Sequence, residues 1–289
     1  MTLRQTMTTA LRLIAMGFPV FLLFSCTGTL TKTFITPALD SMQEQSDLEL
    51  VCEGTPSYLL MIDSLIAGHP HDPEMLTIGA QAYSGYIGAM IECDKSAARV
   101  QAMAGKAHRY GTSLLAELLS IDANDDFQSF GDKLQRADED DAGELFWAAF
   151  ALVVWVQQQE GAPAAMAWLG KIELLLLKII ELDEEVEMGG AHFLLGGYYG
   201  SRPVMFGGDP RRSRHHFQRA LEISSRRMLI YQTIYAETYG RLTMNRQLHN
   251  ALLEEVLDFP LSSYPPNMLA NQIAKRKARR LLADGFFTE

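Results

Sequence analysis

The chain of 289 residues is poor in cysteine, with three, and it contains 22 glycines and 11 prolines. So few cysteines exclude a disulfide-dense scaffold, and glycine and proline at this level exclude collagen-like and low-complexity architectures. Positive charge is also scarce, because 25 Lys and Arg stand against 35 Asp and Glu, and this balance argues against a nucleic-acid binder. The 48% hydrophobic content is too high for a disordered chain, so it indicates a globular protein with a sizeable core.

The N-terminal residues have the pattern of a secretory signal. Arg4 and Arg12 precede an apolar stretch from Leu13 to Phe24, which falls short of the ~20 residues that span a bilayer as a helix. The stretch ends in Leu23-Phe24-Ser25-Cys26, which resembles a bacterial lipobox. We therefore expect lipid on Cys26, which would hold the protein to a membrane of the cell envelope with its body on the periplasmic side. An ordinary signal cut nearby and an uncleaved anchor are the alternatives.

This pattern predicts three segments. Residues 1–25 form the lipoprotein signal peptide, residues 26–46 the lipidated N-terminus and tether, and residues 47–289 a single helical-repeat domain. Cys52 and Cys93 then remain in an oxidising compartment, on either side of an expected helical hairpin. Antiparallel packing would bring them within bonding reach, but the sequence leaves their pairing open because it does not supply the Cα separation.

Apolar residues recur at helical spacing after residue 50. One stripe that follows this rule consists of Met75, Gly79, Ala82, Tyr83, Tyr86, Ile87, Met90 and Ile91. Asp72-Pro73 and Asp209-Pro210 are start signals for helices, because Asp caps free N–H groups and Pro fits the first helical position. The apolar segment from Leu145 to Val156 predicts a core helix. The predicted fold is all-α.

Internal repeats give the pattern more detail. Leu195-Gly196-x-x-Tyr199 matches the first helix of a tetratricopeptide repeat, and Ser213-x3-Phe217-x2-Ala220 matches the second. A weaker unit begins at Leu76. We therefore expect tetratricopeptide-like stacked helix pairs that form a compact superhelix, an architecture whose concave surface usually binds a protein or peptide.

The sequence resembles the TatT family, the tetratricopeptide-like lipoprotein T components associated with tripartite ATP-independent periplasmic (TRAP) transporters. The resemblance rests on the lipobox at Cys26, the block from Leu194 to Pro203 that leads into Gly207-Gly208-Asp209-Pro210, and the motifs His216-Phe217-x2-Ala220-Leu221, Tyr235-Ala236-Glu237, Leu253-Glu254-Glu255-Val256-Leu257 and Leu269-Ala270-Asn271-x3-Lys275-x-Lys277-Ala278-x2-Leu281-Leu282. It implies a periplasmic, lipid-anchored protein that is not an enzyme. It also implies a homotrimer with a pore and a TRAP-type solute-binding protein as partner.

The loop from Gly196 to Gly208 is the predicted binding segment. Tyr198, Tyr199, Arg202 and Phe206 are candidates for contacting a ligand or partner, because an arginine holds a carboxylate bidentately while aromatic rings cover an apolar body. Such a ligand would be a small hydrophobic molecule or a carboxylate. In the alternative interpretation Tyr199 is a core residue of the repeat and Arg202 pairs with an acidic neighbour.

Metal binding and catalysis have weaker signals. His69-x-His71 and the pair His215-His216 lack the helical spacing and third ligand of a zinc site, so we expect a solvated turn and a solvated helix face, with no metal or cofactor. Paired carboxylates are typical of glycosidases, and the candidates nearest to apolar sequence are Glu173, Glu181 and Glu187. No catalytic motif accompanies them in the sequence. An envelope glycosidase would require a cleft with one carboxyl of raised pKa.

The sequence therefore predicts a lipid-anchored periplasmic component of a TRAP-type uptake system, which binds a solute-binding protein and forms a ligand-conducting oligomer. The alternative is a helical-repeat lipoprotein scaffold for envelope assembly, without a small ligand.

Overall fold

The computed structural model describes residues 35–287, so the predicted signal peptide and Cys26 lie outside the described residues. The chain divides into two compact units, residues 1–44 and 45–289. In the first unit the described residues form helix α3 (Thr36–Gln43). The helices of the second unit are α4 (Leu48–Gly68), α5 (Pro73–Glu92), α6 (Ala97–Leu119), α7 (Phe127–Leu134), α8 (Ala142–Gln157), α9 (Pro163–Met166), α10 (Leu169–Leu182), α11 (Val186–Gly200), α12 (Pro210–Ile223), α13 (Leu229–Tyr235), α14 (Arg246–Asp258) and α15 (Met268–Ala283). Residues 35–287 contain no strand, which confirms the all-α prediction.

Helix starts follow the predicted Asp-Pro signals. The Asp72 carboxylate accepts hydrogen bonds from the backbone N–H groups of Glu74 and Met75, and α5 begins at the following proline. Asp209 caps α12 in the same way through the N–H groups of Arg211 and Arg212. Each cap satisfies donors that the first helical turn leaves free.

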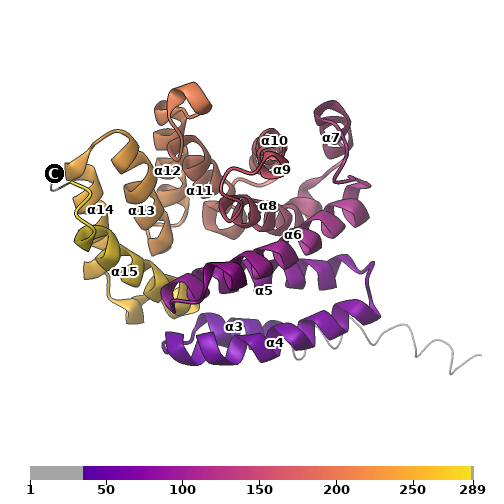
Figure 1. Ribbon diagram of the computed structural model, residues 1–289, viewed down its shortest axis with the longest axis horizontal. Coiled ribbons are helices and arrows are strands. Elements are labelled where there is room, and N and C mark those ends of the chain that lie inside the picture. The colour runs from indigo at the N-terminus through magenta and orange to yellow at the C-terminus, as the bar shows by residue number, and fades with distance from the viewer. Residues whose placement is uncertain (1–34, 288–289) are drawn as a thin grey trace, which may run out of the picture. The chain divides into compact units, whose positions relative to one another are not determined.

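Figure 1 shows how the helices of the second unit pack. Helices α4, α5 and α6 lie side by side in sequence order, and α8 packs on both α5 and α6. Helices α10, α11 and α12 follow, and α13, α14 and α15 form a last group. Helix α15 returns to contact α5 and α4, where the Arg280 guanidinium donates to both carboxylate oxygens of Glu92 at 2.9 and 2.7 Å. The last helix thus completes the packing of the first hairpin.

The predicted core helix is α8. Leu145, Ala148, Ala149, Ala151 and Leu152 on this helix have no exposed surface. Contacts with α5, α6, α10 and α11 cover it on most sides, which explains why this segment is apolar around its whole circumference.

Helix α4 is the one helix among the described residues that has the length and mean hydropathy to cross a membrane. In the structure it packs along α5, and the Cα atoms of Cys52 on α4 and Cys93 after α5 lie 6.7 Å apart with the two sulfurs joined in a disulfide. These contacts make α4 part of the helical unit.

In two pairs of consecutive helices, a glycine of one helix faces an aromatic ring of the next. A Cβ on Gly196 of α11 would lie 2.7 Å from the Phe217 ring of α12, and a Cβ on Gly79 of α5 would lie 2.9 Å from the Tyr110 ring of α6. Gly196 and Phe217 are the residues that the repeat pattern singles out. The pairs support the interpretation as helix-pair repeats, whereas the superhelix stays a prediction.

Candidate functional site

The Glu173 carboxylate on α10 is the centre of a polar network that includes both predicted tyrosines. Tyr198 Oη donates to Glu173 Oε2 at 3.2 Å, and Tyr199 Oη donates to Oε1. Arg212 Nη1 on α12 donates to the same Oε1 at 3.1 Å. Burial raises the pKa of both tyrosines, so they remain protonated donors. The network therefore fixes α10, α11 and α12 relative to one another.

Each tyrosine ring is covered by a guanidinium. Arg202 Cζ lies 4.1 Å from the centroid of Tyr198, and Arg212 Cζ lies 4.0 Å from that of Tyr199. Both are within the range of a cation–π interaction. Arg202 Nη2 also donates to the Tyr198 carbonyl at 3.1 Å, so this arginine folds back on its own loop. No acidic partner of Arg202 is recorded in residues 35–287, unlike the pairing with an acidic neighbour that the alternative interpretation proposed.

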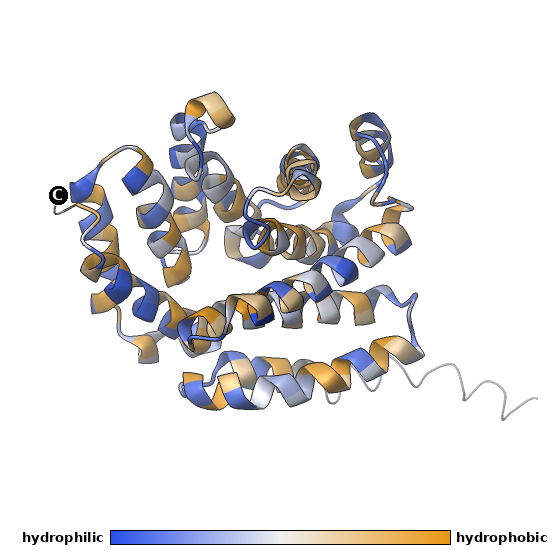
Figure 2. Cartoon of the chain, in the orientation of Figure 1, coloured by the Kyte–Doolittle hydropathy of each residue, from blue (hydrophilic) through white to orange (hydrophobic). Residues whose placement is uncertain are grey.

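Tyr199 is 2% exposed and contributes to the core, whereas Phe206 lies in the opposite environment. The 3-10 turn η3 (Val204–Phe206) carries three large apolar side chains with exposed fractions of 70, 82 and 66%. Figure 2 shows this hydrophobic turn projecting beyond α11 and α12. Of the four predicted residues, Tyr199 is therefore buried, Phe206 is exposed at the tip of the loop, and Tyr198 and Arg202 are partly buried.

The backbone behind the tip is held in one conformation. Gly208 is packed so tightly that a Cβ on it would lie 1.7 Å from the Arg202 carbonyl oxygen. The Asp209 N–H donates to the Tyr199 carbonyl at 3.0 Å, and Gly208 N–H donates to the Pro203 carbonyl at 3.2 Å. These bonds close the loop on itself, so the apolar tip is presented on a fixed base.

A buried histidine pair lies beside this network. His216 on α12 and His192 on α11 approach through their Nδ1 atoms at 2.9 Å, and the His216 ring stacks on Tyr199. Glu184 Oε2 lies 3.4 Å from His192 Nε2, and Arg219 holds this carboxylate bidentately at 3.0 and 2.5 Å. Burial lowers the pKa of His192 and lowers that of His216 to about 3, so both rings are neutral.

The prediction of a solvated helix face at His215-His216 is therefore wrong for His216, which is 7% exposed, while His215 is exposed as expected. His216 follows Ser213 by three positions and precedes Ala220 by four, and both of these small residues are buried on the α12 face that meets α11. That spacing was a signal for burial. At the other predicted turn, the exposed His71 pairs with Glu117 at 2.7 Å. Among residues 35–287 no group of His, Cys, Asp and Glu is arranged to hold a metal ion.

A second network of the same composition lies in the first helix group. Asp63 on α4 accepts hydrogen bonds from the hydroxyls of Tyr83 on α5 (2.9 Å) and Tyr110 on α6 (2.6 Å), and it pairs with Lys106. The Lys106 ammonium also lies 5.1 Å from the centroid of Tyr83. A carboxylate on one helix thus joins two tyrosines and a cation on the next two helices, as around Glu173. The sequence analysis did not predict this network, because Asp63 lies on α4, which is outside the repeat pattern that begins at Leu76.

The three candidate glycosidase carboxylates do not come together. Glu173 is held in its network, and Glu181 pairs with Lys178 on the same helix at 3.0 Å. Glu187 accepts a hydrogen bond from Trp147 Nε1 at 3.0 Å, and although its side chain keeps solvent access, the surrounding protein atoms desolvate the carboxylate and raise its pKa. Glu187 lines neither the cavity over α7 nor the cavity that α12, α13 and α14 enclose.

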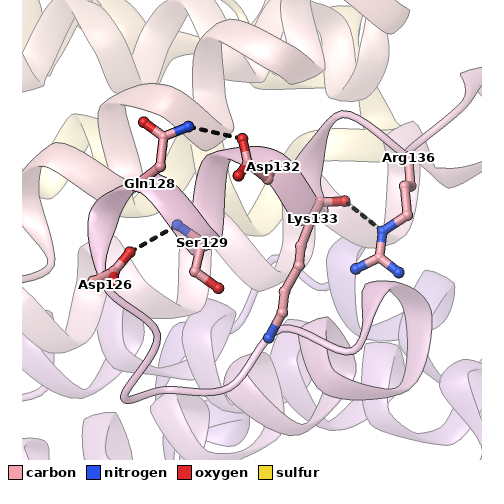
Figure 3. Close-up of a pocket in the computed structure, with 6 residues that line it drawn as sticks. All are labelled: Asp126, Gln128, Ser129, Asp132, Lys133 and Arg136. Carbon is pink, nitrogen blue, oxygen red and sulfur yellow. Dashed lines mark hydrogen bonds between the residues drawn. The ribbon is translucent and has the colours of Figure 1, made fainter.

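A cavity of about 450 Å³ lies over α7 (Figure 3). Its lining side chains come from α7 and the residues beside it, and they satisfy one another. Gln128 donates to Asp132 at 2.8 Å, and Arg136 Nε donates to the Lys133 carbonyl at 3.4 Å. The Lys133 ammonium is taken by Asp125 at 2.6 Å. The Lys133 ammonium and the Gln128 amide are therefore engaged by neighbouring carboxylates within the same segment.

The fold and the site define an all-α protein of closely paired helices that presents an apolar turn on a rigid base. The sequence matches the family model of the TRAP transporter T-component over residues 44–286, and the chain belongs to this family. No curated protein matches the sequence. The family is a transport-associated and non-enzymatic kind, and it places the protein with a TRAP transporter at the membrane of the cell envelope.

Proposed function

We propose that the chain is a lipid-anchored periplasmic component of a TRAP-type solute uptake system. It binds a partner solute-binding protein and forms a homotrimer that conducts a ligand through a pore. Family membership supports the transport role, and the lipobox at Cys26 supports the anchor. The observation that carries partner binding is the exposed turn Val204–Phe206, because a fixed apolar surface on a soluble face is typical of a protein contact.

The four predicted residues have different roles in this proposal. Phe206 contacts the partner directly, together with Val204 and Met205. Tyr198 and Arg202 stack beneath the turn and border the contact. Tyr199 is buried and fixes the base of the loop through Glu173. Preorganisation of this kind reduces the entropy lost on binding.

The test is light scattering of the full chain in a mild non-ionic detergent, alone and with a TRAP-type solute-binding protein from the same organism. We expect a defined oligomer that takes up the partner in fixed ratio. The triple variant Val204→Ser, Met205→Ser, Phe206→Ser should keep the oligomer and lose the partner. The matched control is Met244→Ser, which changes an equally exposed apolar residue (67%) outside the turn. A monomer that ignores the partner would overturn the transport mechanism and favour the envelope scaffold.

A further inference from the structure

A second cavity, of about 270 Å³, is lined by residues of α12, α13 and α14, helices that lie next to one another in Figure 1. Its apolar walls come from Leu221 on α12 and from Leu248 and Leu252 on α14. Two tyrosines, Tyr235 and Tyr239, also line it. This combination gives an apolar body that aromatic and aliphatic groups can cover, as in small-molecule sites.

Tyr239 lies in an unusual turn of helix, and Tyr235 directly precedes that turn as the last residue of α13. Residues Ala236–Gly240 form a π-helix, which widens the backbone directly after α13, and π-helical turns frequently occur at functional sites. Tyr235 is 3% exposed and its ring stacks on Phe217 at 4.6 Å. Among the described residues its hydroxyl has no hydrogen-bond partner. The tyrosine lines the cavity, so its unpaired hydroxyl is a donor available to a ligand there.

The cavity also carries a cation without a counter-charge. Two arginines line it, and Arg226 is neutralised by Glu255, to which Nε donates at 2.6 Å. Arg214 forms no ion pair or hydrogen bond within residues 35–287. None of the lining residues is acidic, in a chain whose formal net charge is −10. The free guanidinium therefore selects for an anion.

We propose that this cavity binds a small apolar carboxylate, with its anion on Arg214, a hydrogen bond from Tyr235 Oη, and its body against Leu221, Leu248 and Leu252. One free cation and one hydroxyl match a monoanion with few oxygens, whereas a phosphate would leave its further charge without a partner. This inference rests on the proposed function in one respect: the small carboxylate is the class of ligand that the proposed transport system would handle. The site is separate from the turn Val204–Phe206.

The experiment measures ligand binding to the full chain in non-ionic detergent by saturation-transfer NMR, with empty micelles as the blank. The probes are benzoate, benzyl alcohol and benzylamine, which share a ring and differ in charge. We expect benzoate to bind about tenfold more tightly than the neutral alcohol, and benzylamine more weakly still. Equal binding of the three probes, or no benzoate binding at millimolar concentration, would overturn the proposal.

Two variants locate the site. Arg214→Gln changes an exposed residue and should weaken benzoate about tenfold, and Tyr235→Phe, which removes only the hydroxyl, should weaken it several-fold. Arg211→Gln, another exposed arginine of α12 that does not line the cavity, should leave binding unchanged. If Arg214→Gln binds benzoate as the parent does, the assignment is wrong.

Partner binding is scored separately on the same variants. Benzoate binding that depends on Arg214 in a protein that ignores the solute-binding protein would support the ligand site and remove the transport function. Partner binding without benzoate binding would support the transport function and overturn the ligand site.

Discussion

The Glu173 side chain holds together the two helices that flank the exposed loop. Its two oxygens accept from Tyr198, Tyr199 and Arg212, and these come from two helices that are separated by the exposed turn. The backbone behind the turn adds a steric constraint at Gly208. Both effects act on single residues, so they are tested by single substitutions.

Gly208→Ala should destabilise the protein. A Cβ would meet the Arg202 carbonyl oxygen at 1.7 Å, so backbone has to move, and we expect the free energy of unfolding in urea to fall by about 3 kcal/mol or more. The control is Gly143→Ala in α8, where a Cβ has no atom within 4 Å and should stabilise the helix by about 0.5–1 kcal/mol. Equal effects of the two substitutions would show that the loop does not pack as described.

The His192–His216 pair makes stability depend on pH. His216 is faced by His192 on α11, with Glu184 behind it, and by His215 and Arg212 on its own helix. Its folded pKa of about 3 lies below the ordinary value of 6.5, so the unfolded chain binds more protons in acid. The contribution is therefore complete above pH 6.5 and is lost as the pH falls from there towards about 3.

Between about pH 7.5 and about pH 5, His216 should account for a loss of about 2 kcal/mol in unfolding free energy. His216→Gln should be less stable at neutral pH but should show a smaller loss on acidification, measured by urea titrations at both pH values. His215→Gln changes the exposed neighbour and should keep the parent's pH dependence. An unchanged pH slope in His216→Gln would contradict the assignment.

At the scale of the helices, the structure has two hairpins fixed by different means. Helices α11 and α12 are joined by a close glycine–aromatic contact and the Glu173 network, whereas α4 and α5 are joined by the Asp63 network and a disulfide. The disulfide closes a loop with a sequence separation of 41 residues. A cross-link of this kind acts mainly by restricting the unfolded chain.

Reduction of Cys52–Cys93 should lower the unfolding free energy by about 3 to 4 kcal/mol, given the loop length. Urea titrations with and without a thiol reductant measure the change, and peptide mass spectrometry without reduction detects the linked pair. The double variant Cys52→Ser, Cys93→Ser should be equally destabilised and insensitive to reductant. A parent protein that is also insensitive would mean that the two cysteines are not bonded in solution.

The helical class, the Asp-Pro starts and the core position of α8 could be predicted because they depend on spacing within one segment. Tyr199 and Phe217 were also recognisable, since the repeat pattern assigns them to a packed pair. The contact of His192 with His216 was not, because it depends on the register in which α11 meets α12. Glu173 was considered only as a catalytic acid, since its three hydrogen-bond donors lie on other helices. The π-helix after α13 has no propensity signal that distinguishes it from an α-helix.

At the scale of the second unit, the last helix, α15, packs against the first two helices, α4 and α5. Ala274, Ala278 and Leu281 of this helix are buried, and Gln272 Nε2 donates to the Ser46 carbonyl. The Glu92 side chain is 5% exposed and is held by the bidentate contact with Arg280. Loss of that contact would leave a buried carboxylate without its cation.

Arg280→Ala should therefore reduce the unfolding free energy by about 1 to 2 kcal/mol. Arg279→Ala removes an exposed arginine that has no ion pair among the described residues, and it should change stability by no more than about 0.5 kcal/mol. Chemical denaturation of both variants gives the comparison. If they are alike, the contact between α15 and α5 contributes little to stability.

The return of α15 to α5 also matters for the order in which the chain is made. A ribosome produces α5 long before α15, and α5 lacks one of its packing partners until the last turns of helix have been synthesised. Contacts between such distant segments slow folding, because a long loop has to close before they form. The newly made chain therefore leaves one side of α5 uncovered until synthesis ends, and this helix reaches its final packing only in the finished chain.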